Sequence, residues 1–466
     1  MLTENIKYTA AGKRFAIRCT VLAAILLVCL SNGCSRGGGK DYNVLIVTLD
    51  TTRRDHLGCY GKSPLTPNLD AFAADGVRFD MAISTSGATP IAHASIMTGL
   101  NPYDHGVRVI YAESGYRLRE SVPTLAELLR EGSWKTGAFL SSFTVSSFFG
   151  FNRGFEVFSE GLQVPPDQSF ARQNNGFWGW PVHLNQRRSD ETTNETIAWI
   201  ENTNERFFAW VHYWDPHDSR LVPPDSLIAR FVTRDMDEET VKRRLYQAEV
   251  LYIDTQFGRL IQTLKQQGVY DNTIIVVVGD HGEGLGNHGW WHHRILYQEQ
   301  IQIPLLMRVP GWPTGVVVQD LIRNIDVTPT ILKALDLETP AKTTGLDVAP
   351  LVHGESEPSP RVAYADAINI FDLNAGLVDQ RPDDALLFCA TDGRWKLIHR
   401  PLIEGKDELY DLVSDPTEQV NLFSSQPEQV ERLKSRLDAF NGYVDKPFGN
   451  PTDEKVIERL KSLGYM

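Results

Sequence analysis

Apolar runs rich in β-branched residues constrain this chain most, because two of them end directly in metal-binding side chains. Residues 43–49 are followed by Asp50, and residues 274–279 are followed by Asp280 and His281. Continuous Val, Ile and Leu runs of this length predict strands that are buried on both faces. In open α/β sheets, ligands gather outside the carboxyl ends of the strands. The sequence therefore predicts that the two acids and the imidazole meet at one edge of a sheet.

These three side chains could bind a divalent cation. Two carboxylates and an imidazole suit Zn²⁺ or Mn²⁺, or Ca²⁺ if further oxygen ligands join them. The alternative is that each acid only caps the helix that follows its strand. The two strand ends, taken together with the segment around Thr89, favour the metal site.

The order of the elements predicts the fold class. Strand-like and helix-like segments alternate through the first 340 residues, including an apolar run at 206–213 and a helical pattern of apolar residues over 250–264. This alternation predicts an α/β fold with a mostly parallel sheet. Near residue 360 the pattern changes, since 393–399 and 407–412 predict a hairpin and 426–437 predicts a helix. A small α+β subdomain is therefore expected at the C-terminus.

We accordingly divide the chain of 466 residues into a leader (1–34), a linker (35–41), a catalytic domain (42–360) and a C-terminal subdomain (361–466). Residues 164–188, rich in Pro, Gly, Asn and Gln, predict a long surface insertion that walls the pocket. Lys and Arg total 46 against 59 for Asp and Glu, and no basic block is present, so no nucleic-acid partner is expected.

The leader predicts export. Four basic residues precede an apolar run at 20–30, which is shorter than the roughly 20 residues of a membrane-spanning helix. The residues around Cys34 resemble a bacterial lipoprotein cleavage site followed by a flexible tether. We expect a periplasmic protein or a lipoprotein that meets the membrane only through its lipid anchor, with an uncleaved leader as the third possibility. Cys59 and Cys389 remain for the folded part, as two free thiols or as a pair.

The segment TPIAHASIMTG at residues 89–99 carries the second chemical signal. Thr89 is expected in a loop before a helix that begins near Ile91. A hydroxyl near the positive end of a helix and beside a cation would have a lowered pKa and could act as a nucleophile. The alternative is that Thr89 merely caps this helix.

Four motifs together resemble signatures of the sulfatase family of the alkaline phosphatase superfamily, and the resemblance spans most of residues 42–466. They are DTTRRDHLGCYG (50–61), MTGLNPYDHG (97–106), GDHGEGLGNHG (279–289) and ELYDLVSDPTEQVNL (408–422). The resemblance implies an alkaline-phosphatase-like α/β/α sandwich. It also implies a metal-dependent hydrolase, with Ca²⁺ as the family's usual metal, that cleaves sulfate or phosphate and phosphonate esters of small molecules or glycans.

The nucleophile motif departs from the family pattern. Sulfatases carry Cys-x-Pro-x-Arg, or Ser at its start, and oxidise the first residue to formylglycine; Thr89 and His93 stand at the first and last of these positions. Because the β-carbon of threonine already carries a methyl, no formylglycine is expected. The segment also resembles that of nucleotide pyrophosphatase/phosphodiesterases, in which an unmodified threonine attacks phosphorus. Pro90 is displaced by one residue, however, so Ala88 could hold the nucleophile position instead. The chain would then be an inactive cell-surface homologue that binds glycans.

The resemblance assigns roles to single residues around one divalent cation. The implied metal ligands are Asp50, Thr51, Thr89, Asp280 and His281. The implied catalytic residues are Thr89, His93, His105, His217 and His293, the last in place of the family's lysine.

Arg53 and His292 are further candidates, for contact with an anionic substrate, and the alternative for both is a solvated surface position. A second metal would need a set such as Asp215, His217 and His292. Because Asp215-Pro-His217 lacks the phosphodiesterase spacing, only one metal is expected. The sequence does not predict the oligomeric state.

Overall fold

Three predicted apolar runs lie side by side in the centre of a sheet. In the computed structural model they form β1 (Asn43–Leu49), β5 (Phe207–Tyr213) and β6 (Thr273–Gly279), and every residue of the three strands is buried. β1 pairs in parallel with both neighbours. The predicted positions and the parallel pairing of these strands are confirmed.

The structure describes residues 40–61, 65–110, 112, 115–160, 186–217, 223–357, 359–372 and 375–440. The chain divides into two units, residues 1–40 and 41–466, and the helices and strands that the structure describes lie in the second. The predicted leader, nearly all of the linker and residues 164–185 of the predicted insertion lie outside the described residues. Among the described helices, none combines the length and the apolar character needed to cross a membrane.

Further strands on both sides of the central three complete the large sheet. They are β2 (Val77–Ile83), β3 (Lys135–Phe139), β4 (Val157–Ser159), β7 (Gln302–Ile303), β8 (Leu305–Arg308) and β9 (Val316–Arg323). The α-helices of the described residues are α2 (Pro67–Ala74), α3 (Thr89–Thr98), α4 (Pro102–His105), α5 (Leu125–Glu131), α6 (Ser189–Glu201), α7 (Asp225–Phe231), α8 (Glu238–Gln266), α9 (Gln298–Ile301), α10 (Val327–Ala334), α11 (Ala349–Val352), α12 (Ala375–Gln380) and α13 (Pro427–Ala439).

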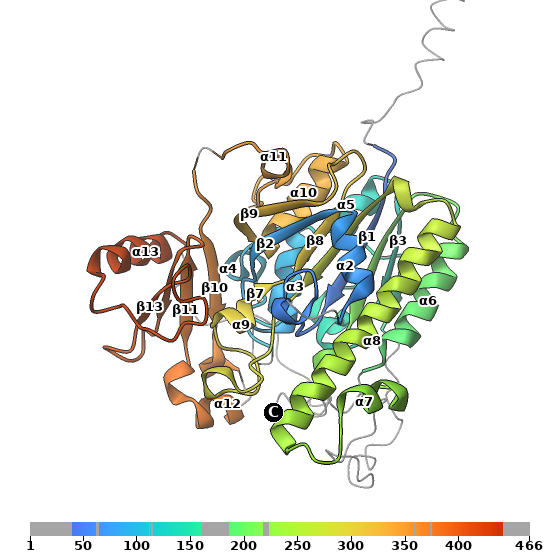
Figure 1. Cartoon of the computed structure of the whole chain (residues 1–466). Coiled ribbons are helices and arrows are strands. Elements are labelled where there is room, and N and C mark those ends of the chain that lie inside the picture. The colour runs from blue at the N-terminus through green and yellow to red at the C-terminus, as the bar shows by residue number, and fades with distance from the viewer. Residues whose placement is uncertain are drawn as a thin grey trace, which may run out of the picture. The chain divides into compact units, whose positions relative to one another are not determined.

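The large sheet is mostly parallel, as predicted. Its strands follow the order β4-β3-β5-β1-β6-β8-β2-β7, and β9 pairs with β2. The pairs β4–β3, β3–β5, β5–β1, β1–β6 and β2–β9 are parallel. β8 pairs antiparallel with β6 and with β2, and β7 pairs antiparallel with β2. Figure 1 shows the helices on both sides of this twisted sheet.

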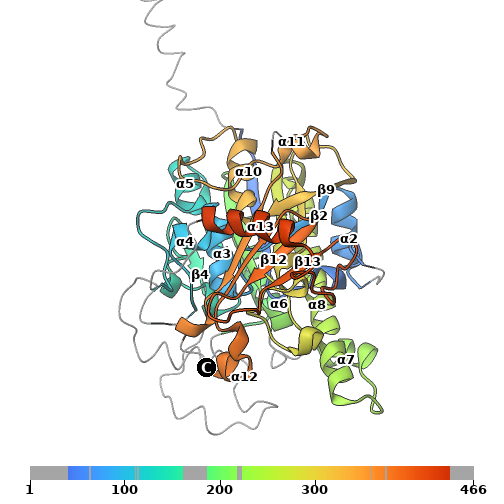
Figure 2. The same cartoon turned by 90° about the vertical axis from the view of Figure 1, so that its left-hand side faces the viewer.

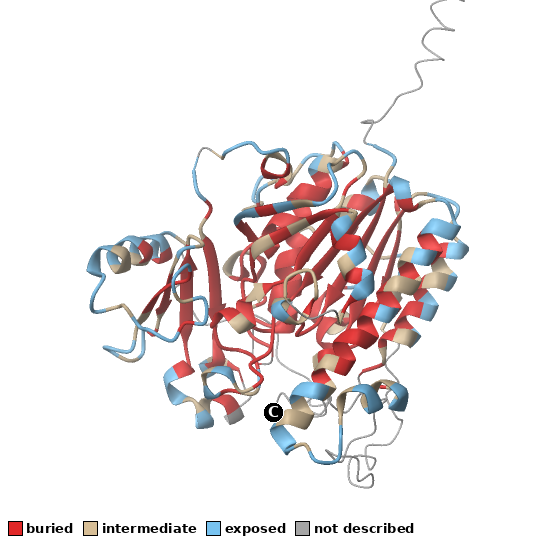
Figure 3. Ribbon diagram, viewed as in Figure 1, coloured by how far each residue is buried: buried red, intermediate tan, exposed pale blue. Residues whose placement is uncertain are grey.

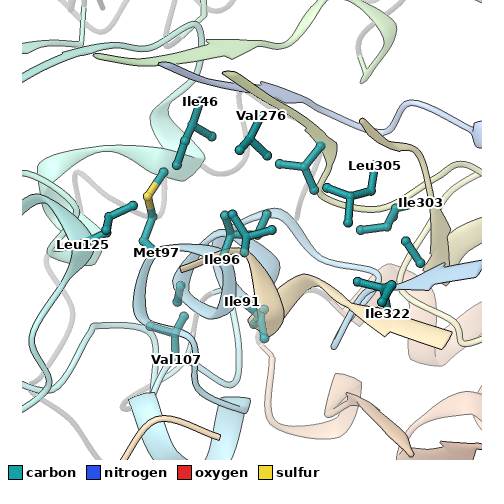
Figure 4. Close-up of a cluster of buried hydrophobic side chains, with 14 of the residues drawn as sticks. Ile46, Ile91, Ile96, Met97, Val107, Leu125, Val276, Ile303, Leu305 and Ile322 are labelled. Carbon is teal, nitrogen blue, oxygen red and sulfur yellow. The ribbon is translucent and has the colours of Figure 1, made fainter. Parts of the chain in front are cut away.

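Alternation along β1 explains the layers, because successive side chains of a strand point to opposite faces. Val44 and Ile46 join a core cluster that includes α3, α5 and α10, and Figure 4 shows Ile46 and Val276 above Ile96 and Met97 of α3. Leu45 and Val47 join a second cluster with residues of α2, α6 and α8. Figure 3 shows the strands buried between helices whose outer faces are exposed. The predicted α/β/α sandwich is confirmed.

Helix α3 lies deepest in this sandwich, since all ten of its residues are buried. It begins at Thr89, two residues before the predicted start near Ile91, so the prediction of a loop at Thr89 was wrong. The helix ends at Thr98 and is capped by Gly99, whose φ of 69° lies in the left-handed region that glycine adopts most readily. The helical pattern over 250–264 falls inside the longer helix α8, as predicted.

The C-terminal part contains a separate antiparallel sheet of β10 (Ala363–Ala367), β11 (Leu387–Thr391), β12 (Trp395–His399) and β13 (Glu408–Asp411). The predicted hairpin corresponds to β12 and β13, and the predicted helix to α13, which packs against β11 and β12 (Figure 2). The boundary at residue 360 stays a prediction. Cys59 and Cys389, the two cysteines of the described residues, are both free.

Candidate active site

The two acids predicted to meet do lie together, and the strand register explains why. Leu49 of β1 pairs with Gly279 of β6, so the next residues of the two parallel strands, Asp50 and Asp280, leave the sheet side by side. Asp50, Asp280 and His281 each offer a ligand atom, and these atoms lie within 4.8 Å of one another. All three residues are fully buried. This cluster is the centre of the candidate site.

Hydrogen bonds fix one oxygen of each carboxylate and leave the other for a ligand. The backbone N–H groups of Thr51 and His281 donate to Asp280 Oδ1, at 3.0 and 2.7 Å. Nε2 of His212 donates to Asp50 Oδ2 at 3.0 Å, because its Nδ1 accepts from the Ser141 N–H at 3.4 Å. Among the described residues, Asp50 Oδ1 and Asp280 Oδ2 are buried without a hydrogen-bond partner.

These residues fit a divalent cation. Burial, followed by the neighbouring charge of Asp280, raises the pKa of Asp50 well above its usual value, and burial raises that of Asp280. Two buried carboxylates with unsatisfied oxygens are unfavourable unless a positive charge balances them. His281 donates from Nδ1 to the Gly282 carbonyl at 2.9 Å, which makes Nε2 the nitrogen that can bind metal. Asp50 Oδ1, Asp280 Oδ2 and His281 Nε2 would therefore hold the ion.

A divalent cation should therefore stabilise the fold. Relative to chelator-treated protein, Zn²⁺, Mn²⁺ or Ca²⁺ at one hundred times its dissociation constant should add roughly 2.7 kcal/mol to the free energy of unfolding. The measurement is the melting temperature with each ion, for the wild type and for Asp280→Asn, which should lose the response. Asp271→Asn, whose side chain is 90% exposed, is the control and should keep it. An unchanged wild-type melting temperature with all three ions would contradict the metal site.

Thr51, a predicted ligand, approaches the site with its backbone. Its φ of 45° is unusual for a β-branched residue, and it is held by the N–H contact to Asp280 and by Tyr246, whose hydroxyl donates to the Thr51 carbonyl at 2.8 Å. Its Oγ1 is buried and has no hydrogen-bond partner among the described residues. Metal binding by this hydroxyl stays a prediction.

The Thr89 side chain faces the acid cluster. Thr89 is the first residue of α3, behind the N-cap Ala88, and its Oγ1 lies 3.2 Å from His281 Nε2. Burial and the charge of Asp280 raise the pKa of Asp50, and the Thr89 side chain acts on this pKa in the opposite direction. Because the N-cap is Ala88 and the Thr89 hydroxyl contacts the site, the alternative that Thr89 only caps the helix is wrong.

The displaced proline does not disturb this arrangement. Pro90 is the second residue of α3, and the first hydrogen bond within the helix is donated by the Ala92 N–H to the Ala88 carbonyl. The N–H groups of the first turn have no acceptor inside a helix, so a proline fits at either of its early positions. A shift of proline by one residue therefore does not require Ala88 to replace Thr89 beside the acids.

His93 lies one turn along α3 from Thr89. Its Nδ1 donates to the Thr89 carbonyl at 2.8 Å and lies 3.6 Å from Asp280 Oδ2. Burial lowers the pKa of His93 to about 4, so the ring is neutral at physiological pH. The predicted site residue His93 is thus brought to the cluster, where it supports the start of the helix.

His217 and His293 form another side of the site. The His293 ring centroid lies 4.7 Å from that of His281 and 4.9 Å from that of His217. Nδ1 of His293 contacts Glu283 Oε2 at 3.2 Å, and His217 stacks on Trp214 with ring centroids 3.7 Å apart. Burial lowers the pKa of His293 well below its usual value and raises that of Glu283 to about 7. A neutral imidazole oriented by a carboxyl group can exchange a proton with a ligand.

The other predicted residues have different neighbours. His105 bonds Ser95 Oγ at 3.0 Å and accepts from the Val107 N–H, which ties α4 to α3. Arg53 forms a double hydrogen bond with Asp55 and also reaches the Glu283 carbonyl at 3.3 Å. These contacts indicate that both residues position the site, and their predicted contacts with substrate stay predictions.

Two more candidates differ in exposure and in partners. His292 is exposed, and its role with substrate also stays a prediction. Asp215 accepts hydrogen bonds from the N–H and the hydroxyl of Ser189 at the start of α6. Its carboxylate is occupied in capping that helix, and the expectation of a single metal stays a prediction.

Two site residues were missed by the sequence analysis. His212 lies in β5, where the register places it beside Thr48 of β1, two residues before Asp50. The available signal was an imidazole inside an otherwise apolar strand. Glu283 follows Asp280 and His281 in the same motif, but its partner His293 is ten residues away along the chain. Only the folded loop brings that pair together.

The site thus combines a buried hydroxyl at the start of a helix with acids at the carboxyl ends of central strands. Residues 42–337 match the family model described as sulfatase, and residues 286–441 match the C-terminal model of N-sulphoglucosamine sulphohydrolase. The chain belongs to the sulfatase family, and it is a sulfatase-family hydrolase.

Relatives cover nearly the whole chain. An N-acetylglucosamine-6-O-sulfatase of Bacteroides thetaiotaomicron is 23% identical and aligns over 94% of this chain and 92% of its own length. An arylsulfatase of Clostridium perfringens is 24% identical over 85% of this chain and 92% of its own. Among solved structures, the phosphonate monoester hydrolase of Agrobacterium radiobacter has a TM-score of 0.65 at 21% identity, covering 91% of this chain and 96% of that one. These similarities span both the large sheet and the C-terminal sheet.

Proposed function

We propose that this protein hydrolyses phosphate, phosphonate or sulfate esters with the unmodified hydroxyl of Thr89 as nucleophile. The observation that carries the proposal is the contact of Thr89 Oγ1 with His281 Nε2 at 3.2 Å, at the first residue of a buried helix. The names of the relatives agree with this range of esters, since they include sulfatases and phosphonate monoester hydrolases.

The reaction has two displacements. The Thr89 oxygen forms a bond to the phosphorus or sulfur of the ester, and the bond from that atom to the alcohol oxygen breaks. Water then attacks the same atom, which releases the acid and restores the Thr89 hydroxyl. A divalent cation held by Asp50, Asp280 and His281 would stabilise the negative charge on the reacting oxygens.

The chain's own residues orient these steps. The N-terminus of α3 directs its positive end at the reacting centre, which favours the anionic form of the Thr89 oxygen. His293 is held by Glu283 through Nδ1, which leaves Nε2 to carry the protons: it passes the Thr89 hydroxyl proton to the leaving alcohol in the first displacement, and a proton of the attacking water back to the Thr89 oxygen in the second. His212 and the Thr51 N–H keep the two carboxylates in place.

Phosphorus esters are the favoured substrates. A formylglycine hydrate has a second hydroxyl on the same carbon, and that hydroxyl can expel sulfate from the covalent intermediate. A sulfated threonine has no such group, so water must attack the sulfur atom. A phosphorylated threonine can be opened by water attack at phosphorus without a second hydroxyl.

The test compares phosphate monoesters, phosphate diesters, phosphonate monoesters and sulfate esters of one chromogenic alcohol. We expect the kcat/KM values for at least one phosphorus ester to exceed that for the matched sulfate ester by roughly tenfold or more, with activity lost in chelator and restored by metal. Turnover of the sulfate ester alone would overturn the preference. Glycan binding without turnover of any ester, with each metal supplied, would support the inactive homologue instead.

A further inference from the structure

Two arginines, the buried Arg294 and the half-buried Arg108, line a small pocket next to the start of α3. Arg108 follows α4, and Arg294 directly follows His293. Ala88, the residue before Thr89, and Ile91 on the first turn of α3 line the same pocket. A group bound there would therefore lie beside the reacting centre, and the proposed hydrolysis does not use either arginine.

Arg294 has an unused donor that points to a ligand. Its residue is only 6% exposed, and one guanidinium nitrogen, Nη2, donates to Asp372 Oδ2 at 2.6 Å. The other, Nη1, is buried and has no hydrogen-bond partner among the described residues. A buried donor of a charged group that lacks an acceptor is unfavourable, so such donors are usually satisfied by a ligand or by water.

Arg294 has an unfavourable backbone conformation that its hydrogen-bond partners maintain. Its φ of 79° lies in the left-handed region, which is strained for a residue with a side chain. Asn369 Nδ2 donates to the Arg294 carbonyl at 3.0 Å and also to the Asp384 carbonyl at 2.9 Å. The loop that follows β10 therefore fixes the arginine next to His293.

Arg108 is fixed from the same subdomain. Its Nη2 donates to Asp366 Oδ2 at 2.6 Å, and Asp366 lies on β10. The Asp366 N–H in turn donates to the Thr85 carbonyl at 3.0 Å, and the Ser86 hydroxyl donates to the Asp366 carbonyl. The segment that leads to Thr89 is thus joined to the strand that holds Arg108.

The charges around the two arginines are compatible with reversible binding of an anion. Each guanidinium is paired with one carboxylate, so the two arginines remain stable in the absence of a ligand. Only one nitrogen of Arg294 is used by its aspartate, and the planar fork of arginine can present another to a carboxylate, sulfate or phosphate oxygen. The pocket is narrow, with room for about one water-sized group, so it accepts the oxygen of a substituent and no ring.

We propose that Arg294, together with Arg108, binds an oxyanion substituent on the ester substrate, a second anionic group in addition to the ester that is cleaved. The protein would then select esters of molecules that already carry a carboxylate or a further sulfate or phosphate. This proposal rests on the proposed ester hydrolysis, because it names the class of alcohol that is released.

The first experiment measures selectivity as a ratio. We compare kcat/KM for hexose monoesters of the favoured acid that are otherwise neutral, that carry one further sulfate, or that carry a carboxylate on the aglycone. The ratio of charged to neutral ester should be roughly ten to one hundred in the wild type and should fall to about one in Arg294→Gln. Arg294→Lys, which keeps the charge and loses the fork, should give an intermediate ratio. The two charged esters show which oxyanion the pocket prefers.

The matched control is Arg308→Gln. Arg308 also pairs with aspartates, Asp271 at 2.7 Å and Asp75 at 3.3 Å. It lies beside Ile275 of β6, toward the end of that strand away from Asp280, so its substitution should leave the ratio unchanged. Melting temperatures of all variants exclude unfolding as the cause. A wild-type ratio near one for both charged esters, or an unchanged ratio in a folded Arg294→Gln, would overturn the proposal.

A direct binding measurement separates this proposal from the proposed function. Calorimetric titration of the wild type and of Arg294→Gln uses a hexose disulfate that serves as a probe whether or not it is cleaved. One outcome is that no ester is turned over, but the probe binds and its affinity falls roughly tenfold or more in Arg294→Gln. This outcome would support oxyanion binding in the pocket and contradict the proposed ester hydrolysis. If neutral esters are turned over and the probe binds both proteins with equal affinity, the proposed hydrolysis is supported and oxyanion binding in the pocket is contradicted.

Discussion

Thr89→Ala should lower kcat roughly 10³-fold or more, because it removes the only atom that the proposed mechanism allows to form the covalent intermediate. Thr89→Ser should retain activity at a level roughly tenfold below the wild type. Serine keeps the hydroxyl but loses the methyl that restricts the side chain to few rotamers, so the oxygen is less well held against His281. The measurement is kcat on the best ester from the panel, with metal supplied.

Thr98→Ala is the matched control for this result. Thr98 lies on the same helix, and its hydroxyl donates to the Ala94 carbonyl at 2.6 Å, within α3. The same chemical change at that position should leave kcat within about threefold of the wild type, because the hydroxyl makes its bond inside the helix. A Thr89→Ala protein that folds and keeps full activity would show that another group is the nucleophile.

Trapping the intermediate gives an independent readout. Rapid quenching during turnover of a phosphate ester should yield a peptide that contains residues 89–99 with one added phosphoryl group, located on Thr89 by fragmentation. The intermediate should be missing in Thr89→Ala. Its appearance on a different residue of the wild type would contradict the mechanism even if the variant lost activity.

The sheet and its acidic edge could be predicted because both depend on local sequence. Fully buried strands consist mostly of continuous apolar residues, so β1 and β6 can be recognised as runs, and the first charged residues after them are Asp50 and Asp280. Parallel neighbours end at the same edge, which brings the two carboxylates together. The C-terminal hairpin and α13 were visible for the same reason, since their periodicities are regular.

The rest of the site depends on contacts between distant segments. His212 donates a hydrogen bond to Asp50, although the two residues are 162 positions apart in the sequence. No local sequence pattern around either residue predicts this contact. The start of α3 was placed two residues late because the first turn carries a proline and a threonine, which sequence rules associate with loops and caps as readily as with helix. The Arg294 pocket needs an aspartate from the C-terminal part of the chain, so it became visible only in the fold.

Lys396→Met should have the largest effect on stability, about 3–5 kcal/mol in the free energy of unfolding. Lys396 on β12 and Glu418 are both fully buried, and their charged atoms lie 2.7 Å apart. Removing the lysine leaves the buried Glu418 carboxylate without the ammonium group that it pairs with. The measurement is denaturant unfolding of the wild type and of the variant, and Lys406→Met is the control in the same subdomain. Lys406 pairs with Asp383 at 3.0 Å at the surface, so its loss should change stability by less than about 1 kcal/mol.

The same substitution should also reach the active site, because Glu418 contacts Gln298 and His288, which lie on either side of His293 along the chain. Its Oε2 accepts from the Gln298 N–H at 2.6 Å, and its carbonyl lies 3.2 Å from His288 Nε2. A double variant, Lys396→Met with Glu418→Met, should recover most of the stability, since neither charge remains buried alone. It should not recover the activity, because the contact of the Glu418 carboxylate with Gln298 is lost as well. Recovery of both quantities would show that the pair stabilises the fold without positioning the loop.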